Sequence, residues 1–428
     1  GYQGNNMVDV LVTNGPMLIM IAAAFGFLMA WGIGANDVAN AMGTSVGSNA
    51  ITIKQAIIIA MIFEFAGAFL AGGEVTSTIR KGIIDASYFT DVPELLVYGM
   101  IASLLAAGIW LVVASALGWP VSTTHSIIGA IVGFAAVGVS ADSVEWGKVG
   151  GIVGSWVVTP AISGFIAYII FQSVQKLIFN TDDPLASAKR YVPFYMALAG
   201  FVMSLVTITK GLSHVGINFS TVEAYALAIV VAAVVGLAGK IAISRLKMSD
   251  KADLKTQYGN VEKVFAILMV VTACCMAFAH GSNDVANAIG PLAAVVSVVE
   301  SGGVIGAKAV LAWWILPLGA VGIVLGLAIF GQRVMQTIGK NITHLTPSRG
   351  FAAELAAAST VVIASGTGLP ISTTQTLVGA VLGVGMARGI AAINIGVVRN
   401  IVVSWVITLP AGAALSILFF FIIKSIFS

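Results

Sequence analysis

The sequence contains few charged residues. Only 9% of its 428 residues are Asp, Glu, Lys or Arg, whereas soluble globular proteins average about 25%. Hydrophobic residues make up 58% of the chain, and its mean hydropathy is +1.01. A water-soluble surface cannot be built from so few charges, so a soluble fold is excluded. The composition, with 48 glycines that permit close helix packing, predicts an all-α polytopic membrane protein.

Cysteine is nearly absent, and basic residues form no patch. Cys274 and Cys275 are adjacent in an apolar run, which is unsuited to a structural disulfide, so we interpret them as packing residues. The 21 Lys and Arg residues are dispersed and the net charge is only +3, which argues against a nucleic-acid partner. We interpret residues 1–15 as an N-terminal segment that opens with a cloning remnant before Met7 and has no signal peptide.

Long apolar runs are abundant. A membrane span needs about 20 apolar residues, and twelve such runs lie near 16–36, 51–72, 95–117, 120–140, 149–172, 191–212, 222–244, 261–281, 305–331, 350–369, 371–388 and 396–425. Pro120 and Pro370 each separate two runs without a polar loop. We predict about twelve transmembrane helices, with re-entrant hairpins as the alternative at these two prolines.

Charge placement predicts the orientation of these spans. The two hydrophilic loops, 173–190 and 245–260, flank one pair of runs and therefore lie on one side. If that side is cytoplasmic, fifteen of the 21 basic residues lie inside, as the positive-inside rule requires. Both termini are then predicted to be extracytoplasmic, in a multi-pass protein of the cell membrane.

Two halves of the chain repeat each other. Four motifs match in the same order, beginning at residues 34 and 281, 78 and 337, 120 and 370, and 155 and 404. The first motif ends the first predicted run and its copy ends the eighth, an odd offset that reverses direction across the bilayer. We predict inverted-topology repeats at 16–172 and 261–428, separated by a two-helix scaffold at 173–260. Transporters of this kind bind substrate at the repeat interface.

Each copy of the first motif carries an aspartate flanked by asparagines. Spacings of three and four residues place these side chains on one helix face. A carboxylate inside a membrane is costly unless a cation or a cavity matches it; the alternative is an aspartate solvated at a helix end. Oxygen ligands suit a hard cation, and the four histidines are scattered, which argues against zinc or iron. We predict sodium ligands at Asn36, Asp37, Asn40, Asn283, Asp284 and Asn287.

The repeated Pro-x-Ser-Thr-Thr motif predicts an anion site. Proline near a helix start leaves the next N–H groups unpaired, and these amides with the hydroxyls attract an anion to the positive end of the helix dipole. The alternative is that the hydroxyls bond back onto the preceding turn. We predict that phosphate or a similar oxyanion contacts Ser122, Thr123, Thr124, Ser372, Thr373, Thr374 and Gln375.

The charge balance of these motifs predicts coupled transport. Asp37 and Asp284 with a divalent oxyanion would bring four negative charges together, and neither motif contains Lys or Arg. Burying that imbalance is prohibitive, so cations must enter with the anion. Two or more sodium ions per anion are the simplest solution, and protonated carboxylates are the alternative. Glu64 and Glu354 also lie within apolar runs, and Glu64 is the stronger functional candidate of the two.

The motif Gly34-Ala-Asn-Asp-Val-Ala-Asn-Ala, its copy after His280 and the Pro-x-Ser-Thr-Thr pair resemble those of the inorganic phosphate transporter (PiT) family. The resemblance implies an importer of inorganic phosphate, coupled to sodium or to protons, with no enzymatic activity and no organic cofactor. It implicates Glu64, His280 and Glu354 in coupling and is compatible with a homodimer. The short loops indicate a prokaryotic form of the cell inner membrane.

Three other functions remain open from the sequence. They are a proton-coupled carrier of phosphate or metal phosphate, a sulfate carrier, and an anion channel. A channel is disfavoured because paired buried carboxylates repel a freely permeating anion. A hydrolase is disfavoured because no nucleophile–base pair is visible.

Overall fold

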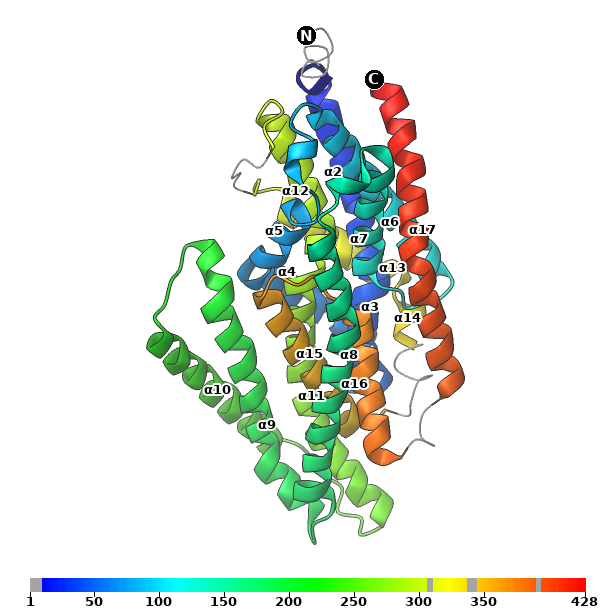
Figure 1. Cartoon of the computed structure of the whole chain (residues 1–428). Coiled ribbons are helices and arrows are strands. Elements are labelled where there is room, and N and C mark those ends of the chain that lie inside the picture. The colour runs from blue at the N-terminus through cyan, green and yellow to red at the C-terminus, as the bar shows by residue number, and fades with distance from the viewer. Residues whose placement is uncertain (1–9, 306–310, 337–344, 390–393) are drawn as a thin grey trace.

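The computed structural model describes residues 10–305, 311–336, 345–389 and 394–428 and is almost entirely helical (Figure 1). Within these ranges the only β pairing is an isolated bridge between Ile84 and Val144. Among the same residues, eight helical stretches are long and apolar enough to cross a membrane, and shorter apolar helices accompany them. The prediction of an all-α polytopic membrane protein is confirmed, while the number of spans remains a prediction.

The chain's first half opens with a helical stretch of 33 residues, Gly15–Gly47. It comprises α2 (Gly15–Ile33), η1 (Gly34–Val38) and α3 (Ala39–Gly47). The η1 segment is π-helical and contains the first Asn-Asp motif; such bulges are frequent at functional sites. The apolar run near 16–36 predicts a span that ends at the motif, but the helix continues to Gly47. The motif therefore lies in mid-helix, which removes the alternative of an aspartate solvated at a helix end.

The rest of this half contains two short α-helices, α5 (Gly73–Lys81) and α7 (Thr123–Gly138), among longer ones. Its other elements are α4 (Ile53–Ala71), η2 (Ala86–Tyr88), α6 (Pro93–Ala116), η3 (Ala141–Ser143) and α8 (Trp146–Val174). The start of α4 is fixed by a capping box in which Thr52 and Gln55 satisfy each other's backbone N–H groups.

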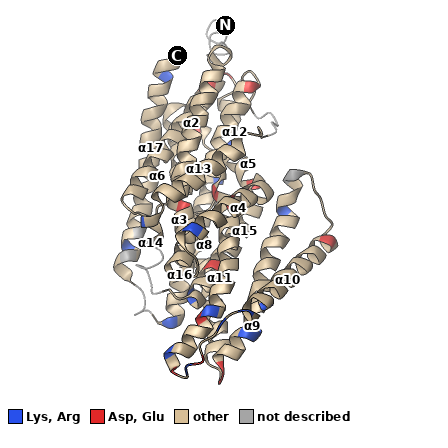
Figure 2. Ribbon diagram, turned by 180° about the vertical axis from the view of Figure 1, so that it is seen from behind, with Lys and Arg blue, Asp and Glu red and all other residues tan. Residues whose placement is uncertain are grey.

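A helical hairpin separates the two halves. Its elements are η4 (Gln175–Phe179), α9 (Pro184–Val206), η5 (Thr207–Gly211), η6 (Leu212–Val215) and α10 (Thr221–Ser244). The turns before α9 and after α10 lie at the same end of the molecule (Figure 1). A group of Lys and Arg residues gathers at that end (Figure 2). This arrangement agrees with the predicted placement of both hydrophilic loops on one side.

The second half contains α11 (Leu254–Asp284), α12 (Ala286–Glu300), α13 (Ile315–Phe330), α14 (Gln332–Gln336), α15 (Pro347–Gly366), α16 (Thr373–Arg388) and α17 (Ile395–Phe427). The second Asn-Asp motif lies at the junction of α11 and α12, within one helical stretch of 47 residues, Leu254–Glu300. It is therefore also in mid-helix. Figure 1 shows the start of α2 and the end of α17 at the same end of the molecule.

The two prolines leave α7 and α16 short. Each helix has 16 residues and begins only after an extended stretch that follows Pro120 or Pro370. At 1.5 Å per residue such a helix is about 24 Å long, less than the ~30 Å thickness of the hydrocarbon core. Their starting points are therefore inside the protein, which favours the re-entrant alternative at both prolines.

Glycines bring the halves into contact in matched pairs. A Cβ atom on Gly379 of α16 would lie 2.4 Å from the carbonyl oxygen of Pro160 in α8. A Cβ atom on Gly129 of α7 would lie 2.6 Å from the carbonyl oxygen of Leu409 in α17. Both positions require glycine because the neighbouring backbone leaves no room. Each short helix is thus fastened to a long helix of the other half.

Candidate functional site

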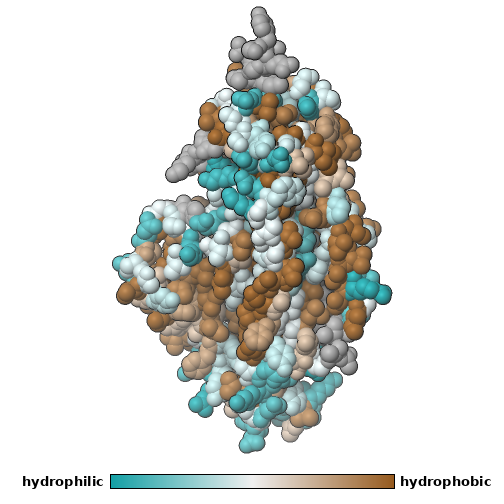
Figure 3. Space-filling model, viewed as in Figure 1, coloured by the Kyte–Doolittle hydropathy of each residue, from teal (hydrophilic) through white to brown (hydrophobic). Residues whose placement is uncertain are grey.

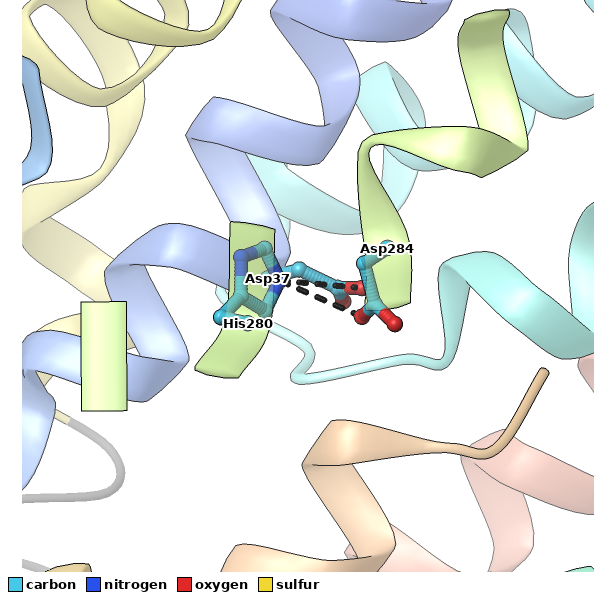
Figure 4. A group of neighbouring side chains, drawn as sticks. All are labelled: Asp37, His280 and Asp284. Carbon is cyan, nitrogen blue, oxygen red and sulfur yellow. Dashed lines mark ion pairs between the residues drawn. The ribbon is translucent and has the colours of Figure 1, made fainter. Parts of the chain in front are cut away.

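The two Asn-Asp motifs meet at the centre of the molecule. Nε2 of His280 lies 3.1 Å from Oδ2 of Asp284 and 3.8 Å from Oδ2 of Asp37. Figure 4 shows the carboxyl groups of the two aspartates converging beside the imidazole ring. All three side chains are buried, with exposed fractions of at most 1%. Residues 247 positions apart therefore form one site, which we call the central cluster (Asp37, His280 and Asp284).

The Ser-Thr-Thr turns contact this cluster from both halves. The Thr123 hydroxyl donates a hydrogen bond to Oδ2 of Asp37, and the Thr373 hydroxyl donates one of 2.6 Å to Oδ2 of Asp284. Each turn thus donates to the aspartate of its own half, and the Thr374 hydroxyl of the second turn also lies 3.4 Å from Oδ1 of Asp37. Since each hydroxyl has a single hydrogen, both donors are committed to carboxylates in this structure.

The second threonines connect the two turns to each other. The Thr124 hydroxyl donates to the carbonyl oxygen of Ile371 at 2.7 Å, and the Thr374 hydroxyl donates to that of Val121 at 3.3 Å. Nδ2 of Asn287 lies 3.0 Å from the Thr123 hydroxyl and 3.2 Å from the Thr124 hydroxyl. The starts of α7 and α16 therefore lie face to face beside the aspartates.

Ser122 and Ser372 act as helix caps. Their hydroxyl oxygens accept hydrogen bonds from the backbone N–H groups of His125 at 3.0 Å and Gln375 at 3.2 Å. These caps hold the positive ends of two short helices toward the central cluster. Gln375 is half-buried, and among the described residues its side chain makes no hydrogen bond with the other predicted anion ligands.

Asn36 supports the turn before α7. Its Nδ2 donates to the carbonyl oxygen of Trp119 at 2.6 Å, and its Oδ1 accepts from the N–H of Val121 at 3.0 Å. Trp405 of α17 donates to the carbonyl oxygen of Pro120 at 3.1 Å. Three consecutive residues of the turn are thereby fixed.

Asn283 supports the turn before α16 in the same way. Its Nδ2 donates to the carbonyl oxygen of Leu369 at 2.9 Å, and its Oδ1 accepts from the N–H of Ile371 at 3.1 Å. Trp156 of α8 donates to the carbonyl oxygen of Pro370 at 3.0 Å. The side-chain oxygen and nitrogen of Asn283, like those of Asn36, form hydrogen bonds with the backbone and hold the turns in place; sodium binding by these two residues stays a prediction.

Several buried oxygens of the site lack a hydrogen-bond donor. They belong to Asn40, Asp284 and Asn287, and in each case Oδ1 has no donor among the described residues. The three side chains have exposed fractions of at most 1%. A buried oxygen without a donor is costly, and a bound cation removes that cost. These atoms therefore fit a hard cation with oxygen ligands.

A Glu64–His280 pair extends the central cluster on one side only. Nδ1 of His280 lies 2.8 Å from both carboxylate oxygens of Glu64. In the first half, the motif places Ile33 at the position equivalent to His280. Gly281 packs against the carbonyl of Glu64 as Gly34 packs against that of Ile323, so Ile323 is the equivalent of Glu64. The polar pair thus has an apolar counterpart, and the two halves of the site differ.

The position of His280 between Glu64 and the two aspartates could not be predicted from the spacing of residues in the sequence. Scattered histidines argue against a histidine metal site, but the structure brings His280 beside both aspartates. One ligand atom from each member of the central cluster lies within 4.8 Å of the others. The fold therefore assembles a group of three potential metal ligands, of which one is an imidazole nitrogen.

Glu354 lies in a separate polar cluster. Its Oε1 accepts hydrogen bonds from Thr44 at 2.6 Å and from Ser45, and its Oε2 accepts one from Thr272 at 2.7 Å. Its side chain is fully buried. Its hydrogen-bond partners in the described part of the chain are these three hydroxyl groups, and no Lys or Arg there pairs with it. Glu354, in α15, thus contacts residues of α3 and α11 and is not in the hydrogen-bond network of the central cluster.

Comparisons with known proteins identify the family. Residues 33–416 match the phosphate transporter family. The chain belongs to the phosphate transporter family. It is 57% identical over 421 residues, 98% of this chain and 100% of the other, to a Haemophilus influenzae protein provisionally named a phosphate permease. It is 43% identical to the chloroplastic inorganic phosphate transporter 2-1 of Arabidopsis thaliana, over 94% of this chain and 72% of that one.

A solved structure of a protein described as "the sodium-dependent phosphate transporter" has the same fold. The TM-score is 0.88 at 42% identity, over 96% of this chain and 100% of that chain. The resemblance to the phosphate transporter family seen in the motifs is thereby confirmed. The family consists of transporters, so the expectation of a multi-pass carrier rather than an enzyme is also confirmed. The roles of individual residues in this phosphate transporter remain predictions.

Proposed function

We propose that this phosphate transporter imports inorganic phosphate together with sodium by alternating access. The observation that carries the proposal is the set of buried oxygens without donors on Asn40, Asp284 and Asn287, beside two helix N-termini that face each other. The oxygens fit cations, and the helix N-termini fit an oxyanion. Membership of the family supports phosphate as the anion, and similarity to a sodium-dependent phosphate transporter of known structure supports sodium.

Phosphate would bind between the Ser-Thr-Thr turns. The backbone N–H groups that begin α7 and α16 have no partner within their own helices, and Thr123, Thr124, Thr373 and Thr374 carry hydroxyl donors at the same place. Two helix dipoles directed at one point favour a tetrahedral anion of charge minus one or two. The capped serines hold this geometry, and Gln375 borders it.

Sodium would bind the carboxylate and amide oxygens on the other face of the same space. Asp37, Asp284, Asn40 and Asn287 supply the ligands. Asn36 and Asn283 assist by fixing the turns, because their amide groups are engaged with backbone. Sodium is thus a cosubstrate.

The hydroxyl hydrogens provide a physical reason for coupling. Thr123 and Thr373 can donate either to an aspartate, as they do in this structure, or to phosphate. When phosphate takes these hydrogens, Asp37 and Asp284 each lose a hydroxyl donor beside a newly bound anion, and His280 remains next to both carboxylates. Added cations then compensate the extra negative charge in this buried site. Phosphate and sodium therefore bind favourably together and poorly alone.

The inverted repeat remains a prediction that the matched contacts support. The hydrogen bonds of Asn36, Thr123, Thr124 and Trp156 each have a counterpart in the other half. We propose that the repeats at 16–172 and 261–428 build the site and move against scaffold that includes 173–260. The homodimer and the extracytoplasmic termini are likewise proposals, and the gathering of basic residues at one end (Figure 2) supports the orientation.

Uptake of radiolabelled phosphate into proteoliposomes tests the proposal. An inward sodium gradient at equal pH should drive accumulation, and replacement of sodium by potassium should abolish it. Uptake that follows only a proton gradient would reject sodium coupling, and uptake suppressed by unlabelled sulfate at equal concentration would reassign the anion. Steady single-channel currents would indicate a channel.

A second candidate is symport of a metal–phosphate complex. It is favoured by the central cluster, whose one nitrogen and two carboxylate ligands can converge on a divalent cation. In that case phosphate uptake would depend on a divalent metal and would be lost on chelation. Sodium-driven uptake that persists in a chelator would exclude this mechanism.

A further inference from the structure

A small basic cavity lies at the junction of α8 and α9. None of the residues that line it belongs to the central cluster or to the Ser-Thr-Thr turns. It has a volume of about 280 Å³ and is lined by Lys176, Leu177, Thr181, Ala186, Ser187, Arg190 and Tyr191. The lining combines two cationic side chains with three hydroxyl groups and contains no carboxylate. Such a combination matches a phosphate-type anion.

The local fold directs the charges into this cavity. The π-helical η4 carries Lys176 at the end of α8, and the first turns of α9 carry Ser187 and Arg190. The Thr181 hydroxyl donates to the carbonyl oxygen of Ile178 at 2.6 Å and lies 3.0 Å from the Ser187 hydroxyl, and the Arg190 guanidinium lies 5.4 Å from the centre of the Tyr191 ring. Among the described residues, neither Lys176 nor Arg190 forms an ion pair. The carboxylates of the same turn, Asp182 and Asp183, line a different cavity.

The surroundings of the cavity are apolar and exposed. Leu177 is 37% exposed, and Phe194, one turn further along α9, is 69% exposed. The cavity belongs to the end of the molecule where hydrophilic surface borders the hydrophobic belt (Figure 3). A free phosphate ion would need only the basic groups, whereas a lipid would use both features, with its headgroup at the cations and its acyl chains along the leucine and phenylalanine.

We propose that this cavity binds the headgroup of an anionic phospholipid. Lys176 and Arg190 contact the phosphodiester, and the hydroxyls of Ser187 and Tyr191 contact the phosphate or the polar part of the headgroup. Basic pockets at the cytoplasmic ends of membrane helices recognise anionic lipids in this way. The bound lipid would fasten the α9–α10 hairpin to α8. This site is independent of phosphate transport and does not rest on its mechanism.

Native mass spectrometry of the purified full-length chain tests the proposal. The protein is mixed with phosphatidylglycerol and phosphatidylcholine of identical acyl chains, and the retained lipids are counted. The wild-type chain should retain phosphatidylglycerol preferentially. Lys176→Gln/Arg190→Gln should lose this preference by about fivefold per removed charge. Arg190→Gln alone should give an intermediate loss.

A charge-matched control separates the cavity from general surface attraction. Lys189→Gln/Lys255→Gln removes two exposed basic groups near the same end that do not line the cavity, and it should retain phosphatidylglycerol as the wild type does. Equal retention by both double variants would overturn the proposal. Displacement of phosphatidylglycerol by inorganic phosphate at similar concentration would also overturn it, because the site would then prefer the free anion. Unchanged thermal unfolding of each variant in phosphatidylcholine alone verifies folding.

Discussion

At the scale of single residues, the aspartates of the site accept hydrogen bonds from hydroxyl groups, and no lysine or arginine among the described residues pairs with them. Asp37 and Asp284 each receive a hydrogen bond from a threonine of the same half, and His280 is the only imidazole of the central cluster. A buried carboxylate with so few partners depends strongly on whatever binds beside it. We therefore expect substitutions of these residues to affect transport more than they affect stability.

Replacing either aspartate by asparagine should nearly abolish coupled uptake. Asp37→Asn and Asp284→Asn keep the side-chain volume but remove the charge that attracts sodium in the proposed mechanism, and a loss of ~1.4 kcal/mol or more in cation binding would reduce uptake about tenfold or more. Sodium-driven uptake of radiolabelled phosphate in proteoliposomes measures the effect. The control is Asp85→Asn, a partly exposed residue outside the spans whose pKa is lowered by hydrogen bonds from Ser87. Near-normal uptake in both cluster variants would refute the cation site.

Removal of the asparagine that holds a turn should weaken phosphate affinity. Asn36→Ala leaves the Trp119 carbonyl and the Val121 N–H without a partner, at a cost of about 1–3 kcal/mol for each buried group. We expect a raised KM for phosphate and a lower midpoint of thermal unfolding. Asn283→Ala should behave alike because its contacts are equivalent, whereas Asn180→Ala in an exposed turn should change neither quantity. An unaltered KM in both buried variants would contradict the positioning role.

At the scale of helices, short and long elements are joined by backbone contact. The helices α7 and α16 begin beside the central cluster, and each crosses a long helix of the other half at a glycine. A larger residue at either glycine would clash, because the opposing group is a backbone carbonyl, which cannot move aside as a side chain can. The crossing of α8 and α16 is therefore a rigid joint between the halves.

Gly379→Ala should loosen this joint. The new Cβ would lie 2.4 Å from the Pro160 carbonyl oxygen, and overpacking of this kind typically costs about 1–3 kcal/mol. The midpoint of thermal unfolding in detergent should fall. Gly154→Ala in α8 is the matched control, because nothing lies within 4 Å of its added Cβ and alanine favours helix. A fall of equal size in both variants would show that the crossing is not the cause.

At the scale of the whole molecule, the chain places its hydrophilic turns at opposite ends. Asp182 and Asp250 lie in the turns that flank the α9–α10 hairpin, and Asp142 lies in η3 between α7 and α8. All three are exposed. Since α8 runs the length of the molecule between η3 and the hairpin (Figure 1), the first two residues belong to one side of the membrane and the third to the other.

Side-specific labelling should reproduce this division. In a chain that carries Cys274→Ala and Cys275→Ala, an impermeant maleimide added to intact cells should label Asp142→Cys. Asp182→Cys and Asp250→Cys should react only after the membrane is opened. Labelling of all three from outside, or of Asp182→Cys and Asp250→Cys from different sides, would reject the orientation.

Much of the site was predictable from the sequence because it is duplicated. The repeated motifs identify Asp37, Asp284 and the threonines, and the structure brings these residues together. The contacts of Asn36 with the turn before α7 could not be predicted, since they depend on how α2 crosses α6. The π-helical form of η1 was also hidden, because hydrophobic periodicity does not distinguish it from an α-helix.

The Glu64–His280 pair makes the two halves of the carrier energetically unequal. Two identical inverted halves would give the outward-open and inward-open conformations the same free energy, so an empty carrier would divide its time equally between them. Here Ile33 and Ile323 occupy the places that mirror the pair, so in the proposed alternating-access cycle the two conformations would rearrange different polar groups. Each ~1.4 kcal/mol of difference shifts their ratio tenfold. We therefore expect the site of the empty carrier to be open mainly toward one side of the membrane, and the next phosphate would bind from that side.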